Sequence, residues 1–345
     1  MPLNHSRRHF LRAALLCGGF LGASPLLTPV LPPLARAAAR PAVRQQTRLF
    51  MGVVVTVSVA GSDAERAEAA LERAFARGRA LADIFTRFDA ASPVGMLNAG
   101  GHLADVPPEL TAMLEAARRI SRLTGGAFDV TVLPLLRLLE ERRNAGESPH
   151  LAGNELREAL ELVGAEHLEV GGGRLRFARS GMALTLDGIA KGHIAECMSR
   201  ELIAAGCPNH LVNAGGDMVA RGRKAPGAPW RVAVEDPRKR GRYPQALALT
   251  TGGAIATSGG YEIFYDAAQR HTHLVSPATG QSPALASVTV TAPDGLMADA
   301  LATALSVMPP REALALADSL PGCACCLLRR DGLLRASGRW QGQRV

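Results

Sequence analysis

The stretch "MADALATAL" (residues 297–305) places one acid and one hydroxyl among small and apolar residues. Asp299 and Thr303 are four residues apart, so on a helix their side chains point from the same face. The same pattern fits a helix start, with Asp299 near the first turn and Thr303 bonding back to a carbonyl. The stretch therefore predicts a helix suited to burial. It leaves open whether the two oxygen-bearing side chains cap that helix or bind a ligand.

The first residues of the chain have the pattern of an export signal. The basic segment "SRRHFLR" (6–12) precedes an apolar run and small residues at Ala35 and Ala37. The paired Arg7 and Arg8 indicate the twin-arginine route, with cleavage near Ala37 and delivery to the periplasm. An uncleaved signal that anchors the protein to the membrane is the alternative. Prolines interrupt the apolar run, which falls short of a clean span of about 20 residues.

Removing residues 1–37 changes the charge of the chain. This segment carries four arginines and no acid, so the formal net charge falls from +8 to +4. The remaining basic residues are scattered among acids and aromatic residues are few, which argues against a nucleic-acid partner. Residues 38–345 are long enough for one large domain. They retain five cysteines, and the run "CACCLL" (323–328), which lacks histidine partners, predicts a buried strand.

Helix and strand patterns follow one another irregularly after the export signal. The β-branched run at residues 50–59 predicts a strand. Helices are predicted over residues 62–85 (with Ser62 and Glu65 in capping-box register), about 108–123, 154–163 and about 189–205. From Leu168 onward, short strands separated by glycine pairs dominate. This order predicts an α+β fold rather than a regular βαβ alternation.

Five further stretches have the composition of site loops. They combine glycines with acids, hydroxyls, a lysine or histidines: "TGGAFDVTVLPL" (124–135), "LDGIAKGHIAE" (186–196), "LVNAGGDMVARG" (211–222), "ATSGGYEIF" (256–264) and "RHTHLVSPATG" (270–280). Glycines before a helix let backbone N–H groups approach phosphate oxygens, and Lys191 adds positive charge. His271 and His273 lie two apart on a predicted strand and share one face. Each stretch alone is a weak signal, because Gly-Gly more often marks a turn.

Together, and in this order, these stretches resemble the ApbE-type flavin transferases, which are FAD:protein FMN transferases. The resemblance runs from Met51 to about Val307 and rests on "FMG", "FTRFDAASPVGMLN", "GGAFDVT", "DGIAKG", "VNAGGD", "TSGG", "HLVSPATG" and "ADALATAL". It implies a single two-lobed α+β domain, related to the T-fold, with FAD between the lobes. It also implies Mg²⁺-dependent transfer of the FMN moiety of FAD onto a Thr or Ser hydroxyl of an acceptor flavoprotein, with release of AMP.

The resemblance further implies roles for individual residues. The metal ligands are the side chains of Asp299 and Thr303 and the backbone carbonyl of Gly188, an oxygen set that suits Mg²⁺. The catalytic residues are Lys191, Asp299 and His273, and either of the last two could accept the hydroxyl proton. The residues implied to contact FAD are Met51, Phe88, Ala127, Phe128, Asp129, Thr185, Lys191, Ser258, His273 and Leu274.

The chain also departs from the family pattern. Relatives often carry Asp at the positions of Thr185, Gly260 and Ser276, and Tyr at that of Phe88. Two other functions stay open: an FAD pyrophosphatase in which water replaces the acceptor hydroxyl, and a periplasmic flavin-binding carrier with little turnover. The segment "LTLDGIAKG" (184–192) resembles the branch whose acceptor is a membrane flavoprotein of nitrous oxide respiration. A membrane-bound respiratory acceptor is therefore implied.

Overall fold

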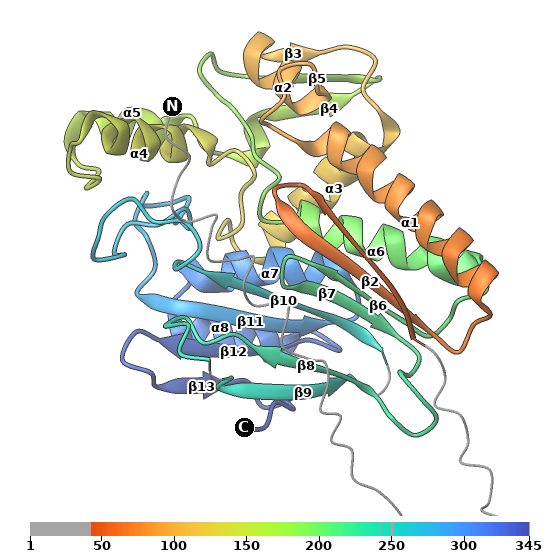
Figure 1. The fold of residues 1–345 in the computed structure, drawn as a ribbon. Coiled ribbons are helices and arrows are strands. Elements are labelled where there is room, and N and C mark those ends of the chain that lie inside the picture. The colour runs from red at the N-terminus through yellow and green to blue at the C-terminus, as the bar shows by residue number, and fades with distance from the viewer. Residues whose placement is uncertain (1–42, 242, 250–251, 345) are drawn as a thin grey trace, which may run out of the picture. The chain divides into compact units, whose positions relative to one another are not determined.

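An eight-stranded antiparallel sheet runs through the centre of the protein (Figure 1). This computed structural model describes residues 43–241, 243–249 and 252–344, and the predicted signal at 1–37, with Arg7 and Arg8, lies outside them. The strand order is β1-β2-β6-β7-β10-β11-β12-β13. The bounds are β1 Val43–Phe50, β2 Val53–Ala60, β6 His210–Ala214, β7 Asp217–Arg221, β10 Gly253–Gly259, β11 Leu285–Ala292, β12 Ala324–Arg329 and β13 Leu334–Ala336.

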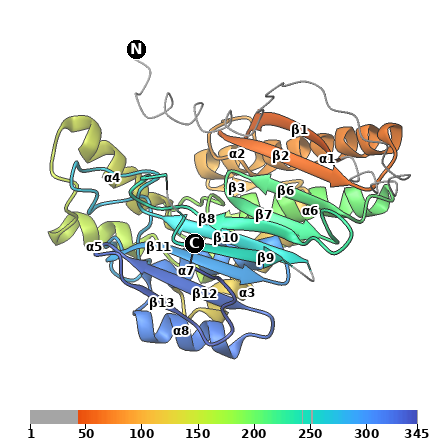
Figure 2. The ribbon, with the colours of Figure 1, turned by 60° about the horizontal axis from the view of Figure 1, so that its bottom comes forward.

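Helices cover one face of this sheet, and a hairpin covers the other (Figures 1 and 2). The helix layer is α1 (Ala64–Phe85), α6 (Ala190–Ala204) and α7 (Gly295–Val307), which share one apolar core with the sheet. The hairpin is β8 (Trp230–Val234) and β9 (Gln245–Leu249), which pack against β7 and β10 in a second apolar cluster. The α+β prediction is confirmed.

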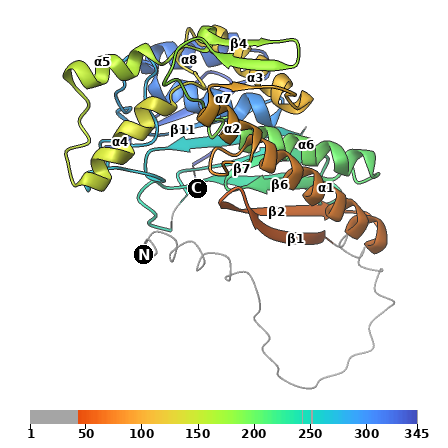
Figure 3. The same ribbon diagram turned by 90° about the horizontal axis from the view of Figure 1, so that it is seen from above.

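The remaining elements extend the helix layer. They are α2 (Pro93–Gly100), α3 (Pro108–Leu123), α4 (Leu133–Ala145), α5 (Gly153–Glu161), α8 (Pro310–Ser319), a short 3-10 helix (Ala165–His167) and the small sheet of β3 (His102–Leu103), β5 (Arg174–Phe177) and β4 (Leu168–Gly171). Seen from above, α4 and α5 lie to one side of the helix layer (Figure 3). Tyr265 and Val275, from the loop after β10, pack into their apolar cluster.

The helix predicted from "MADALATAL" is α7, and it is buried as expected. Its N-cap is Asp294, whose side chain accepts the N–H of Met297 at 2.9 Å. Asp299 therefore lies in the second turn and is only 2 % exposed. The helix-start interpretation of Asp299 is wrong, because another acid already caps the helix.

Two predicted element starts are corrected by local geometry. The strand predicted from residue 50 begins at Val53, because Met51 and Gly52 form the two-residue turn between β1 and β2, with φ of 56° and 71°. Such a hairpin turn needs positive φ at both positions. Helix α1 begins at Ala64 with Asp63 as its N-cap, whereas the capping-box pattern had pointed to Ser62. The carboxylate of Asp63, one residue later, accepts the free N–H of Arg66 in the first turn.

The other predicted helices, and the strand predicted from "CACCLL", agree with the structure to within about two residues. The strand predicted around His271 and His273 is wrong, because these residues lie in the loop between β10 and β11, where Thr272 forms only an isolated bridge with Phe264. Helix α3 has the predicted bounds, and "CACCLL" ends in the buried strand β12. The cysteines from Cys197 onward are all free thiols. Helices α2, α4 and α8 were not predicted; the polar second half of α4 resembles a linker in composition. Among the described residues, no helix has the length and apolarity needed to cross a membrane.

Candidate active site

Polar residues from four separate segments meet at one end of the main sheet. Asp217 opens β7, and Ser258 lies near the end of β10, which pairs antiparallel with β7. Lys191 is in the first turn of α6, and α7 brings Asp299 and Thr303 along the same layer. The pairing of β7 with β10, two central strands of the sheet, thus brings residues that are far apart in sequence to one end of these strands.

Lys191 is held by an acid that the sequence interpretation left without a role. Its Nζ lies 3.0 Å from Oδ2 of Asp217 and donates to the carbonyl of Asp187 at 3.4 Å. Burial works to lower the pKa of Lys191, but the charges of Asp217, Asp299 and Glu262 raise it above its ordinary value. Lys191 is therefore a permanent cation, and its side chain is still 27 % exposed.

Asp299 is fixed where α6 and α7 cross. The N–H of Gly192 donates to its Oδ2 at 2.9 Å. A Cβ added at Gly192 would lie 2.1 Å from the carbonyl oxygen of Gly295, so the crossing requires glycine. Burial raises the pKa of Asp299 to about 7, although Lys191 acts in the opposite direction. This carboxylate would therefore gain from a further cation beside it.

Three neutral oxygen atoms lie together one turn further along α7. The hydroxyl of Thr303 donates to the carbonyl of Gly188 at 3.3 Å and lies 3.2 Å from Oγ of Ser258. A Cβ at Gly188 would lie 2.9 Å from Oγ1 of Thr303. The missing side chain at Gly188 thus lets its carbonyl approach the hydroxyl. The i, i+4 spacing puts the Thr303 hydroxyl on the same face of α7 as Asp299.

This donor set fits a small, hard cation. It combines one carboxylate, one or two hydroxyls and one carbonyl, all oxygen, as Mg²⁺ prefers, and it leaves positions for phosphate or water. Histidine and cysteine, the usual ligands of zinc, take no part in the set. No group of three or more His, Cys, Asp or Glu side chains suited to a metal exists in the described part of the chain. An ion held here would need oxygen atoms from its substrate as well.

His273 is prepared to accept a proton. Its Nδ1 lies 3.1 Å from the carbonyl of Ile263, which fixes Nδ1 as the protonated nitrogen. Burial lowers the pKa of His273, and the charge of Lys191 lowers it further. The ring is therefore neutral near pH 7, with the lone pair on Nε2.

Glu262 and Asp217 are the charged site residues that sequence reasoning missed. Although much of Glu262 is exposed to solvent, desolvation of its carboxyl group raises its pKa, Asp217 adds to the rise and Lys191 opposes it. Glu262 also interacts electrostatically with Asp299. Asp217 directly follows the glycine pair in "VNAGGD", and Glu262 follows the glycine pair in "SGGYE" after one tyrosine. The signal was present in the sequence, but their convergence on Lys191 depends on strand pairing.

The predicted flavin-side residues divide into two groups. Phe128, Asp129 and Thr185 are buried, and Thr185 N–H donates to the carbonyl of Val130 at 2.8 Å, which joins two of the predicted loops. Both carboxylate oxygens of Asp129 accept bonds within the protein, from Thr131 and from the N–H of Ala165. The side chain of Asp129 thus shapes this loop, and its contact with FAD stays a prediction.

The other group is more open to solvent. Phe88 is 76 % exposed, and the guanidinium of Arg87 lies 4.1 Å from its ring centroid. Arg87 also pairs with Asp187 at 2.8 Å, which links Phe88 to the Lys191 loop. Met51 is in the β1–β2 turn and Ala127 is half-buried. Leu274 is the exception, because it is buried. Contact of these residues with FAD also stays a prediction.

Two of the departures from the family pattern have a local explanation. A Cβ at Gly260 would lie 2.8 Å from Cγ2 of Thr272, so the chain is tightly packed there. The hydroxyl of Thr185 accepts the N–H of Asp187 at 3.1 Å and shapes the loop before α6. The site therefore keeps its loop geometry with fewer carboxylates.

Comparison with known proteins gives one consistent answer. The profile of the ApbE family matches residues 51–327. The chain is 31 % identical over 275 residues to the FAD:protein FMN transferase of Klebsiella pneumoniae, covering 76 % of this chain and 78 % of that one. The Escherichia coli K12 protein of the same name is 29 % identical over 278 residues, covering 76 % of this chain and 78 % of that one.

Solved structures agree with the sequence comparison. The flavinyl transferase ApbE of Pseudomonas stutzeri, in its apo form, superposes with a TM-score of 0.72 at 28 % identity, covering 87 % of this chain and 96 % of that one. The ApbE protein of Thermotoga maritima gives a TM-score of 0.76 at 27 % identity, covering 86 % of this chain and 97 % of that one.

Proposed function

The chain belongs to the ApbE family, and we propose that it is an FAD:protein FMN transferase that moves the FMN moiety of FAD onto a Thr or Ser hydroxyl of an acceptor flavoprotein, with release of AMP. The observation that supports this proposal is the convergence of Lys191, Asp299 and Thr303 where α6 and α7 meet β7 and β10, with His273 near enough to Lys191 for the two to interact electrostatically. Phosphoryl transfer depends mainly on positioning and on stabilising charge. These residues supply a fixed cation, a set of metal-binding oxygens and a neutral base.

A divalent cation fits this site, and Asp299, Thr303 and the carbonyl of Gly188 are the residues that would hold it. Mg²⁺ there would supply Lewis-acid stabilisation of charge on the pyrophosphate. Lys191 adds a positive charge that its ion pair with Asp217 keeps in place. The Gly192 N–H fixes the orientation of Asp299.

His273 is the better of the two candidates for the proton acceptor. Its Nδ1 is committed to the Ile263 carbonyl, and Nε2 is left with a lone pair. Asp299 accepts the Gly192 N–H, and a carboxylate that binds a cation is a weak base. We therefore assign the acceptor proton to His273 and the metal-ligand role to Asp299.

One experiment separates transfer from the two alternatives. The protein is incubated with FAD, Mg²⁺ and a threonine-bearing acceptor domain, and the acceptor is then weighed by mass spectrometry. Transfer adds one FMN unit to the acceptor for each AMP released. Free FMN and AMP with an unchanged acceptor would instead show a pyrophosphatase, and bound but intact FAD would show a carrier. An acceptor with Ala in place of the threonine is the control.

We also propose export by the twin-arginine route to the periplasm, and a membrane-bound respiratory flavoprotein as acceptor. The pattern in residues 6–12 and the small residues before position 38 support export. Replacing Arg7 and Arg8 by Lys should leave the precursor in the cytoplasm, as fractionation would show. Normal arrival of this double variant in the periplasm would exclude the route.

A further inference from the structure

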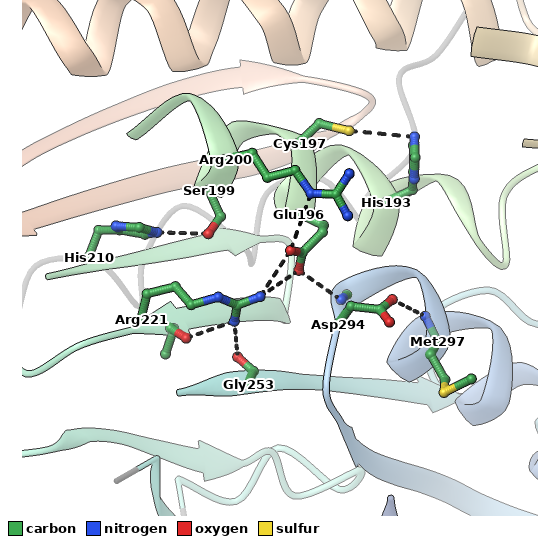
Figure 4. A network of polar contacts seen from close by, with 12 residues as sticks. His193, Glu196, Cys197, Ser199, Arg200, His210, Arg221, Gly253, Asp294 and Met297 are labelled. Carbon is green, nitrogen blue, oxygen red and sulfur yellow. Dashed lines mark hydrogen bonds and ion pairs between the residues drawn. The ribbon is translucent and has the colours of Figure 1, made fainter. Parts of the chain in front are cut away.

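A second ion pair, between Glu196 and Arg221, joins α6 to β7 further along α6 than Lys191 (Figure 4). Nη2 of Arg221 lies 2.9 and 3.0 Å from the two carboxylate oxygens of Glu196, and Glu196 is 6 % exposed. Nη1 of Arg221 donates to the carbonyls of Ala220 and Gly253, in β7 and β10. Arg221 is thus tied to two strands, and its guanidinium presents a fixed partner to α6.

The same carboxylate also holds the start of α7. The N–H of Gly295, the first residue of α7, donates to Oε2 of Glu196 at 3.2 Å. A carboxylate at a helix N-terminus satisfies a free N–H and interacts favourably with the helix dipole. Glu196 therefore connects the sheet, α6 and α7 at one point.

The two helices are joined again one turn nearer the active site. Gly192 of α6 donates to Asp299 of α7, while Glu196 of α6 accepts from Gly295 of α7. Gly192 and Glu196 are four residues apart on α6, and Gly295 and Asp299 are four residues apart on α7. The two contacts are therefore one helical turn apart along a single antiparallel crossing. Between them, the Gly192 and Gly295 backbones approach closely, and a Cβ at Gly295 would lie 2.2 Å from the carbonyl oxygen of Gly192.

This crossing has an energetic consequence for Asp299. Burial raises the pKa of Asp299, so this position is unfavourable for a charged carboxylate unless the surrounding structure is held in place. Gly192 and Gly295 have no side chains that could pack between the two helices and hold them in register. The hydrogen bonds of Glu196 restrain the sliding of α7 along α6 that the glycine contact would allow.

We propose that Glu196 and Arg221 are positioning residues for flavin transfer. Their ion pair fixes the Glu196 carboxylate against β7, and the Gly295 N–H that the same carboxylate accepts fixes α7 against α6. Together these contacts hold the Asp299 carboxylate at the position relative to Lys191 and Gly188 that cation binding requires. This inference rests on the proposed metal-dependent transfer. It adds a role for two residues that lie outside the site itself.

The test compares Glu196→Gln with a matched control on the same helix. Gln keeps the shape and can still accept the Gly295 N–H, but it loses the charge that holds Arg221. Arg200→Gln is the control, because Arg200 approaches Glu196 only at 3.7 Å and its side chain is 67 % exposed; exposed pairs contribute little. A second variant, Glu196→Gln/Arg221→Met, removes both charges and avoids an unpaired buried charge that could prevent folding.

Two readouts are measured on each full-length variant. The first is Mn²⁺ affinity in the presence of FAD, from the electron paramagnetic resonance signal of free Mn²⁺, which requires no turnover. The second is the transfer rate as a function of Mg²⁺ concentration. For Glu196→Gln and for the double variant, we expect Mn²⁺ affinity to fall about tenfold. We also expect half-maximal transfer to need about tenfold more Mg²⁺, with partial recovery of the rate at high Mg²⁺, while Arg200→Gln behaves as wild type.

A lower melting temperature with unchanged Mn²⁺ affinity and Mg²⁺ dependence would overturn the proposal, because it would show a purely structural ion pair. The result also separates the two proposals from each other. If wild type binds Mn²⁺ but transfers no flavin, the proposed function fails, while the positioning role is still decided by Mn²⁺ affinity.

Discussion

Two ion pairs connect α6 to β7, and they differ in how their charges are balanced. At the front, Lys191 pairs with Asp217 and also faces Asp299 and Glu262, so one cation meets three acids. At the rear, Glu196 meets Arg221 and, more distantly, Arg200. Both pairs use the same helix and the same strand. The front pair alone has an excess of negative charge.

Under the proposed function, this difference assigns the chemistry to the front region and the positioning of that chemistry to the rear region. Burial raises the pKa of Asp299 to about 7, with the charges of Asp217 and Glu262 adding to the rise, and this leaves the front region in need of a further cation. The rear carboxylate, Glu196, accepts hydrogen bonds at both of its oxygens, and its charge is balanced by that of Arg221. A close pair of glycines at 192 and 295 links the two regions, so each should respond to changes in the other.

We expect the largest loss of stability and transfer rate for Gly192→Ala, because this change disturbs the glycine contact that links the two regions. The new methyl would lie 2.1 Å from the carbonyl of Gly295, and α7 would have to move. We expect a loss of about 3 kcal/mol of unfolding free energy and a fall in transfer rate of about 100-fold or more. Denaturant unfolding and the transfer assay measure the two losses. Gly100→Ala is the control, since nothing lies within 4 Å of its Cβ position. If Gly192→Ala keeps its transfer rate, the two regions are not coupled.

For Thr303→Val we expect a smaller effect, confined to the front region around Lys191 and Asp299. The change keeps shape but removes the hydroxyl that contacts Gly188 and Ser258. A neutral ligand contributes less than a carboxylate, so we expect transfer to fall about tenfold with a modest change in stability. The rate at several Mg²⁺ concentrations measures it. An unchanged Mg²⁺ dependence would remove Thr303 from the metal site.

Acid should weaken the rear of α6 through buried histidine. Burial lowers the pKa of His210 to about 4, and its two ring nitrogens bond Ser199 and the Cys207 carbonyl at 2.7 Å. Below about pH 6.5, His210 is protonated in the unfolded chain but stays neutral in the folded protein. The free energy of unfolding therefore decreases as the pH falls from about 6.5 toward 4. The slope from this residue is at most about 1.4 kcal/mol per pH unit. Urea unfolding at pH 7.5 and pH 5 should show a smaller difference for His210→Asn than for wild type. An equal pH dependence in both proteins would argue against a neutral buried His210.

The smallest expected effect is on the flavin side, with Phe88→Leu. Because Phe88 is 76 % exposed, its loss should barely change the melting temperature without ligand. If the ring stacks on FAD, affinity should fall about fivefold, which corresponds to about 1 kcal/mol. Fluorescence titration with FAD measures it. Lower apo stability with unchanged FAD affinity would instead make Phe88 a packing residue.

The sequence was sufficient to find some parts of the site and not others. Asp299 and Thr303 were visible because helix periodicity alone places them on one face. The partner of Lys191 was not, because Asp217 reaches it only after β6, β7 and α6 have packed together. The same holds for Glu196, which resembles any other acid on a helix until Arg221 is placed opposite it.

Local sequence signals were equally uneven for the fold. Helix α3 could be bounded correctly because Pro108 begins it and glycines follow its end. The polar strand β1 was not predicted, since it lies at an edge of the sheet and lacks clear alternation. The turn at Met51 and Gly52 was hidden because a non-glycine residue with positive φ is uncommon.

The central claim is that the acid-rich front of α6 and α7 performs metal-dependent flavin transfer, and Asp299→Asn tests it most directly. Asn keeps the size of the side chain and can still accept the Gly192 N–H, but it removes the negative charge. Transfer of FMN to the acceptor is followed by mass spectrometry as Mg²⁺ is raised. We expect the rate to fall by at least about 100-fold at low Mg²⁺ and FAD binding to weaken far less. Near-normal transfer by Asp299→Asn at low Mg²⁺ would contradict the account.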